Sequence, residues 1–166
     1  VHHPFLTEHR QERAGQQQAS ERPSQEAMDR IARLMSRIQE DPQDVQALSE
    51  VARLFMSMQS YERAATFWER VLRVTPDRTA PRQRLAMCYY RLERYEDAAA
   101  ELRHVLELEP DNAYAHYNLG VLLTRFLQQP DQGRRHFRRV LKADGADAEL
   151  RDRARRELSQ SSENTD

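Results

Sequence analysis

The sequence predicts an all-α fold in which antiparallel helix pairs stack in a row. Pro42, Pro76 and Pro110 stand 34 residues apart, and an apolar pattern of helical spacing begins shortly after each of them. Self-similarity at a fixed period of roughly 20 to 50 residues is typical of repeat proteins. The turns expected between the helices, at residues 59–60 and 93–94, are short, so neighbouring helices must run antiparallel.

The residues between the prolines repeat as well. When each repeat is numbered so that its proline takes place 32, small residues recur at places 8 and 20 and large apolar residues at place 24. Small residues are expected where two helices approach closely, because packed interiors leave no space unfilled. The residues are Ala52, Ala86 and Gly120 at place 8; Ala64, Ala98 and, after one inserted residue, Gly133 at place 20; and Trp68, Leu102 and Phe137 at place 24.

A resemblance to the tetratricopeptide repeat (TPR) family over residues 45–144 rests on segments 61–65 (YERAA), 95–99 (YEDAA) and 117–120 (YNLG). It implies a right-handed TPR superhelix of three antiparallel helix pairs with N- and C-terminal capping helices. The sequence departs from the family at place 4, where Trp is usual and Leu48, Arg82 and His116 stand. It departs again in the third repeat, whose inner turn is one residue longer and whose closing proline is replaced by Gly145.

Apolar spacing and proline positions divide the chain into a TPR domain and two tails. Residues 1–23 contain few apolar residues, which predicts a disordered tail or tether. Ser24 is an expected N-cap of the first capping helix. The expected units of the domain, 24–160, are a capping helix 24–40, repeats 45–78, 79–112 and 113–145, and a C-terminal capping helix 148–160, followed by a frayed tail 161–166.

Composition bounds the partners and the compartment only loosely. Charged residues make up 32% of the 166 residues and the net charge is −1, which indicates a soluble protein without a strong partner bias. No apolar run approaches the roughly 20 residues of a membrane span. The chain begins with Val1 rather than Met, which suggests either a processed product or a chain trimmed of an N-terminal segment, so that an anchor or a signal could have been removed. We expect a bacterial protein, either cytoplasmic or periplasmic-facing.

Nothing in the sequence predicts an enzyme or a cofactor. Glycine-rich phosphate loops, nucleophile elbows and His-Glu-x-x-His metal motifs are all absent. His104, His116 and His136 fall on different predicted helices without a histidine three or four places away, so they predict no metal site. Cys88, the only cysteine, falls on a buried helix face and is expected to be a core residue.

The TPR resemblance implies instead a concave groove, lined by the first helix of each pair, that binds a peptide or helix of a partner protein. Tyrosines and methionines suit such a groove, because they offer apolar contact area to irregular partners, and arginines add donors for carboxylates. We therefore predict a ligand with apolar anchors and an acidic group. The predicted groove residues are Ser49, Arg53, Met56, Gln83, Met87, Tyr90, Arg91, Tyr114, Tyr117, Val121 and Arg125.

Several alternatives stay open at this point. A self-assembling structural unit (a homo-oligomer) is one, and a class-two type III secretion chaperone is another. The short form and the place of Trp68 also resemble the tethered TPR domains of bacterial cytochrome c maturation and envelope assembly factors. The two-carboxylate clamp of some chaperone-binding TPR domains is absent, since Ser49, Arg53 and Arg84 occupy clamp places.

Arginines crowd the segment from 134 to 142, which raises the alternative of a nucleic-acid or anionic-membrane patch. Asp131, Asp144, Asp147 and other acidic residues interleave with them, however. That mixture favours a solvated helix face with local ion pairs, so no nucleic-acid partner and no membrane insertion are expected.

Overall fold

The computed structural model describes residues 25–163, and the side chains of residues 25–160. The predicted tail 1–23, the expected N-cap Ser24 and the last three residues of the predicted tail 161–166 lie outside the described residues, whereas 161–163 belong to the last helix. Among the described residues the chain is helical throughout, without strands. A helix over residues 25–40 is followed by α2 (Val45–Ser57), α3 (Tyr61–Val74), α4 (Thr79–Arg91), α5 (Tyr95–Leu108), α6 (Ala113–Arg125), α7 (Pro130–Lys142) and α8 (Ala148–Glu163). The prediction of an all-α superhelix is confirmed.

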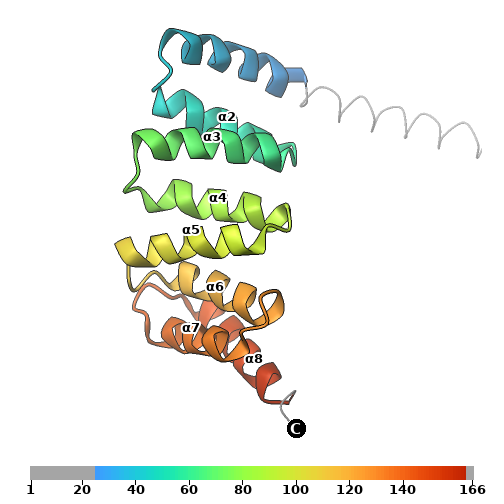
Figure 1. The fold of residues 1–166 in the computed structure, drawn as a ribbon, viewed down its shortest axis with the longest axis vertical. Helices are drawn as coiled ribbons and strands as arrows, with labels where there is room; N and C mark the ends of the chain where they lie inside the picture. The colour runs from blue at the N-terminus through green and yellow to red at the C-terminus, as the bar shows by residue number, and fades with distance from the viewer. Residues whose placement is uncertain (1–24, 164–166) are drawn as a thin grey trace, which may run out of the picture.

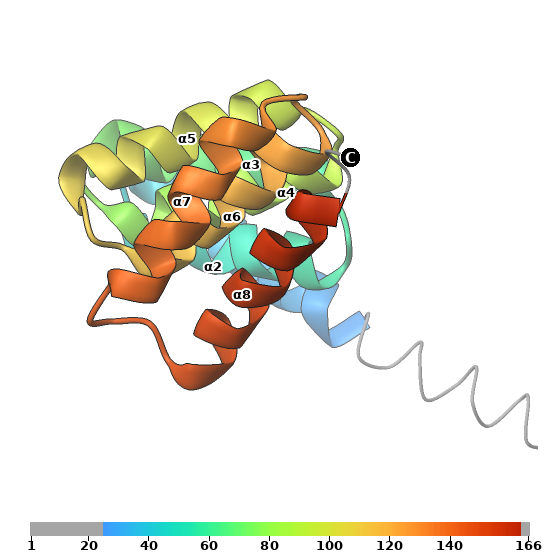
Figure 2. The ribbon, with the colours of Figure 1, turned by 90° about the horizontal axis from the view of Figure 1, so that it is seen from below.

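The helices stack in chain order, each antiparallel to the next (Figure 1). Seen along the stack, α2, α4 and α6 form one layer and α3, α5 and α7 the other (Figure 2). We call α2–α3, α4–α5 and α6–α7 repeats one, two and three. α8 leaves the stack on the side of α6, so it projects beyond the first layer (Figure 2).

The three turns inside the repeats share one backbone feature. Gln59, Glu93 and Gln128 have positive φ values of 58°, 60° and 54°, and each stands two residues before the next helix begins. A left-handed residue reverses the chain sharply after a helix. In repeat three the inserted residue is accommodated at Phe126 and Leu127, before this position, so α7 keeps the usual relation to its turn.

The helix pairs meet at the small residues of places 8 and 20, and repeat three is the tightest of them. A Cβ atom on Gly133 would collide with Thr124 Oγ1 and lie 2.7 Å from the carbonyl oxygen of Gly120. A Cβ atom on Gly120 would lie 2.8 Å from Cε1 of Phe137. Glycine at both places is therefore a requirement of the α6–α7 crossing.

The buried apolar side chains form two clusters. The larger runs from Ile31 in the first helix to Leu123 in α6 and includes Trp68. Cys88 belongs to it, and burial raises the pKa of its thiol to about 11, so at neutral pH it is a protonated core side chain. The smaller cluster joins the start of α6 to α7 and α8 through Ala113, Phe137, Val140, Ala143, Ala146, Leu150 and Ala154.

The helix over 25–40 covers the apolar end of repeat one. Ile31, Leu34 and Ile38 are buried on it. Arg30 forms an ion pair with Glu50 of α2, and Arg37 binds Asp44 Oδ2 at 2.7 Å. The other carboxylate oxygen of Asp44 accepts a hydrogen bond from the backbone N–H of Ala47 at 2.9 Å. One aspartate thus caps α2 and ties the preceding helix to it.

Candidate peptide-binding groove

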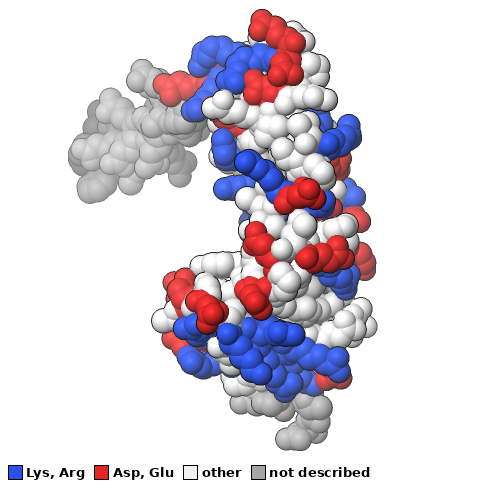
Figure 3. Space-filling model, turned by 90° about the vertical axis from the view of Figure 1, so that its left-hand side faces the viewer, with Lys and Arg blue, Asp and Glu red and all other residues white. Residues whose placement is uncertain are grey.

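A pocket of about 260 Å³ opens between α4 and α6. Leu102 of α5 forms part of its floor, and Glu157 of α8 borders it at one side. Figure 3 shows the molecule hollowed on one side, between its N-terminal part and the projecting end that carries α8. The pocket-lining residues are Gln83, Ala86, Met87, Tyr90, Leu102, Tyr117, Asn118, Val121, Leu122, Arg125 and Glu157.

Six of the eleven predicted groove residues lie together around this pocket: Gln83, Met87, Tyr90, Tyr117, Val121 and Arg125. The structure adds Ala86, Leu102, Asn118, Leu122 and Glu157, which the sequence prediction did not include. Leu102 belongs to a second helix and Glu157 to the last helix, so a rule built on first-helix places could not find them.

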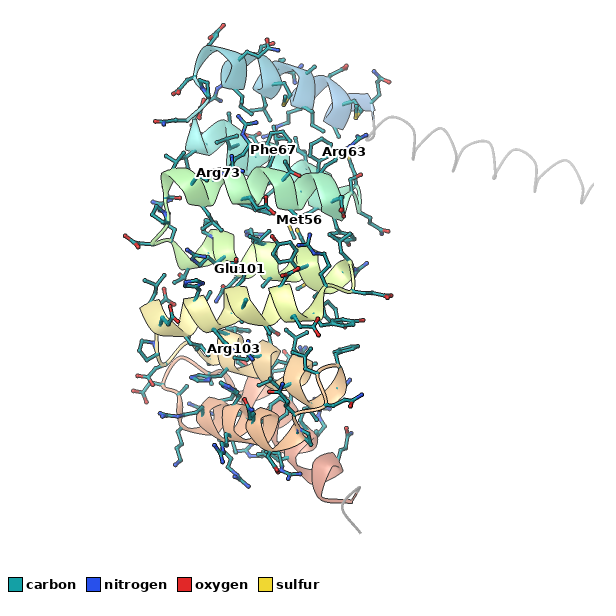
Figure 4. All side chains as sticks on the ribbon, in the orientation of Figure 1. Met56, Arg63, Phe67, Arg73, Glu101 and Arg103 are labelled. Carbon is teal, nitrogen blue, oxygen red and sulfur yellow. The ribbon has the colours of Figure 1, made fainter. Side chains whose placement is uncertain are left out.

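The other five predicted residues lie outside the pocket, and three of them already have partners. The Sδ atom of Met56 accepts a hydrogen bond from Trp68 Nε1 at 3.2 Å, and Figure 4 shows Met56 between α3 and α4. Arg91 lies 4.8 Å from the ring centre of Tyr61, and the Tyr114 hydroxyl donates to Asp147 Oδ2 at 3.0 Å. Ser49 is half-buried and Arg53 is exposed on α2.

Aromatic side chains border the pocket on one side. Tyr90 is 39% exposed and meets Phe126 edge to face, with ring centres 5.7 Å apart. Tyr95 stacks on the same Phe126 ring at 4.2 Å. Phe126 directly follows α6, so the lengthened turn of repeat three delivers the ring that supports Tyr90. Such aromatic contacts add roughly 0.5 to 1.5 kcal/mol beyond area burial, which holds Tyr90 in place.

Tyr117 has a mixed role. Its ring is half-buried, with its centre 5.8 Å from that of Phe137 in the core, and burial raises the pKa of its hydroxyl. It therefore contributes to packing as well as to the pocket wall.

Arg125 is already paired within the chain. Its guanidinium lies 2.5 Å from Oε1 of Glu157, whose residue is only 8% exposed. α8 thus presents a carboxylate to the pocket, at the place where the sequence prediction expected one from a partner. A carboxylate buried beside a guanidinium is held by a charge-assisted hydrogen bond.

The structure also brings together two histidines that sequence spacing kept apart. His116 of α6 and His136 of α7 lie with their Nδ1 atoms 2.9 Å apart, and His116 Nε2 lies 2.8 Å from the carbonyl oxygen of Pro110. A carbonyl only accepts, so His116 Nε2 carries the proton, and His136 Nδ1 then donates to His116 Nδ1. The two histidines occupy places 4 and 23 of repeat three. In repeat two the same places hold Arg82 and Glu101, which form an ion pair, so the place numbers could have indicated that His116 and His136 meet.

Among the described residues, no group of three or more His, Cys, Asp or Glu side chains could hold a metal ion. Within that same part of the chain, no helix has the length and apolar character to cross a membrane.

The fold and the groove define a helical-repeat solenoid of the kind that binds other proteins. Models of the TPR repeat match residues 50–103 and 88–125. Residues 50–125 of the chain therefore carry tetratricopeptide repeats. Among curated proteins no sequence matches the chain.

Solved structures with similar folds are distant in sequence. A MamA protein has a TM-score of 0.74 with 14% identity, over 89% of this chain and 78% of that chain. MamA from Desulfovibrio magneticus RS-1 (residues 41 to the end) has a TM-score of 0.65 with 16% identity, over 76% of this chain and 71% of that chain. The first TPR of Spaghetti (RPAP3), bound to the HSP90 peptide SRMEEVD, has a TM-score of 0.62 with 20% identity, over 73% of this chain and 94% of that chain. These likenesses show the shared fold.

Proposed function

We propose that this protein is a non-catalytic interaction module that holds a peptide or helix of a partner protein in the α4–α6 pocket, as a scaffold or assembly factor. The observation that carries this proposal is the pocket itself, an apolar depression with Met87 and Tyr90 exposed at its edge. The TPR structure of Spaghetti (RPAP3), which has the same fold, contains a bound peptide.

The pocket suits one apolar side chain of the partner. Met87 adapts its shape to irregular partners, and Tyr90 offers a rigid ring with a polar tip. An acidic group of the partner would meet Arg53 or Arg91, neither of which is near a carboxylate among the described residues. Arg125 would first have to release Glu157, so it contributes less to affinity.

The test is a pair of matched substitutions, Met87→Glu in the pocket and Met28→Glu on the first helix. The two methionines are 46% and 45% exposed, so neither substitution removes a core side chain. Peptides selected on the wild-type protein from a random 12-residue display library are then titrated against each variant. Met87→Glu should weaken binding at least tenfold and Met28→Glu should leave it unchanged. Equal binding by wild type and Met87→Glu would show that the pocket is not the site.

A further inference from the structure

The outer side of α7 carries a concentration of positive charge apart from the groove. Four exposed cations of α7 follow one stripe at positions i, i+3, i+4 and i+7, and the exposed Arg103 of α5 joins them. At 1.5 Å per residue the stripe is about 10 Å long. Figure 3 shows basic side chains gathered over the lower part of the face in view, and Figure 4 places Arg103 on the side of α5 toward α6 and α7. We call Arg103, Arg135, Arg138, Arg139 and Lys142 the basic face.

The interleaved acidic residues do not neutralise this face. α7 contains one carboxylate, Asp131, which pairs with Arg134. Three of the acidic residues that follow pair elsewhere: Glu149 with Arg153, Asp152 with Arg155 and Glu157 with Arg125. Within the described part of the chain, no carboxylate lies within ion-pair distance of the five cations of the basic face.

A shallow pocket of about 520 Å³ lies within the basic face, lined by His116, Gln132, Arg135, His136 and Arg139. Burial, the neighbouring His116, and the charges of Arg103 and Arg139 lower the pKa of His136 to about 4. The ring is therefore neutral at pH 7. Arg135 and Arg139 line the pocket, and Arg103 and Arg139 lie close enough to act on His136, so the pocket carries positive charge beside a neutral ring.

We propose that the basic face is a second docking site, which binds an acidic segment of a partner protein. Arginine guanidinium groups bind carboxylates through paired hydrogen bonds, and a stripe of about 10 Å matches three or four carboxylates on two turns of helix or on a short extended segment. The site is separate from the α4–α6 pocket, so one partner could bind each.

Other polyanions fit this face less well. Sites for double-stranded DNA typically contact more phosphates, about six to ten, than five cations can neutralise. Single-stranded nucleic acid needs aromatic rings for stacking, whereas Phe137, the one phenylalanine, tyrosine or tryptophan of α7, is fully buried. Stable membrane binding needs an apolar contribution besides charge, and α7 exposes no large apolar side chain.

The test compares charge-reversal variants of α7 with charge-reversal variants of α3. Arg135→Glu/Arg139→Glu alters the basic face, and Arg63→Glu/Arg73→Glu alters exposed arginines of α3 by the same net charge. The probe is a fluorescein-labelled peptide of twelve glutamates. A 16-base-pair DNA duplex and vesicles with 30% phosphatidylserine are titrated in parallel at equal ionic strength, and circular dichroism confirms that each variant is folded.

The wild type should bind the glutamate peptide, Arg135→Glu/Arg139→Glu should weaken binding at least tenfold, and Arg63→Glu/Arg73→Glu should weaken it less than threefold. Met87→Glu should bind the peptide normally, which separates this site from the groove. The proposal is overturned if the wild type does not bind the peptide, if both double variants lose it equally, or if the duplex or the vesicles bind more tightly than the peptide.

Discussion

Repeats two and three use the same two positions for different chemistry. In repeat two Arg82 forms an ion pair with Glu101 across the helix pair, at 2.8 Å. In repeat three the equivalent residues are His116 and His136, which form a hydrogen-bonded pair at 2.9 Å. Arg82 and His116 also both donate to the carbonyl of the proline that closes the preceding repeat, at 2.9 Å and 2.8 Å.

This comparison shows which part of the arrangement repeats two and three share. A donor at place 4 satisfies the proline carbonyl and fixes the entry to the next repeat, and a partner at place 23 orients that donor. Both an ion pair and a histidine pair can fill this role, because each satisfies its polar atoms. In repeat three the place 23 residue is His136, and burial first, then neighbouring positive charge, lowers its pKa to about 4, so protonation of this ring acts against the folded state.

The same two repeats differ at the helix crossing. Repeat two has Ala86 and Ala98 at places 8 and 20, whereas repeat three has Gly120 and Gly133. The alanine pair keeps two methyl groups between the helices, and the glycine pair leaves no space for them. The third crossing is therefore closer.

The largest expected effect tests that closeness. Gly133→Ala should destabilise the protein by about 3 kcal/mol, although alanine is the better helix former, because the added methyl meets the backbone oxygen of Gly120 at 2.7 Å. Urea unfolding measures the difference. Gly145→Ala is the control, since a Cβ there has no neighbour within 4 Å, and it should change stability by less than about 1 kcal/mol. A neutral Gly133→Ala would mean that the helices of repeat three are no closer than those of repeat two.

A smaller loss of stability is expected when the residues of repeat two at places 8 and 24 are introduced into repeat three. Gly120→Ala alone should cost about 2 kcal/mol, since the new Cβ would lie 2.8 Å from the Phe137 ring. Phe137→Leu, which introduces the residue found at Leu102, should remove most of this conflict. A double-mutant cycle on urea unfolding should then give a coupling of about 1 kcal/mol in favour of the pair. Additive costs would contradict the direct contact.

The smallest effect concerns pH. Burial and neighbouring positive charge lower the pKa of His136 from 6.5 to about 4, so between these values the unfolded chain binds a proton that the folded chain does not. Stability must then fall as the pH falls through this window. With allowance for solvent screening of this partly exposed ring, the loss should be roughly 1 to 2 kcal/mol.

Urea unfolding at pH 7 and pH 4.5 measures this loss, and His136→Asn provides the reference, because its amide keeps a donor for His116 without titrating. The wild type should lose more stability than His136→Asn over that interval. Parallel losses in the two proteins would contradict the assignment.

Six of the residues that line the α4–α6 pocket were among those named from the sequence. Once the 34-residue period is found, the TPR resemblance implies which first-helix places face the groove, and Gln83, Met87 and Tyr90 stand at such places and line the pocket. The predicted residues of α2 lie outside the α4–α6 pocket, and a place number does not say how near the next repeat lies. Met56 shows this, since its sulfur accepts a hydrogen bond from Trp68.

The sequence by itself determined the all-α class, the helix pairs and the small residues at their crossings, because these depend on apolar spacing, on prolines and on glycine, which act within a few residues. The tertiary structure alone decided that Glu157 reaches the groove and that two histidines 20 residues apart meet. It also decided that Glu149, Asp152 and Glu157 pair with arginines outside α7. Those contacts join residues of different helices. They form because the α6–α7 crossing is close and because α8 runs along the side of α6.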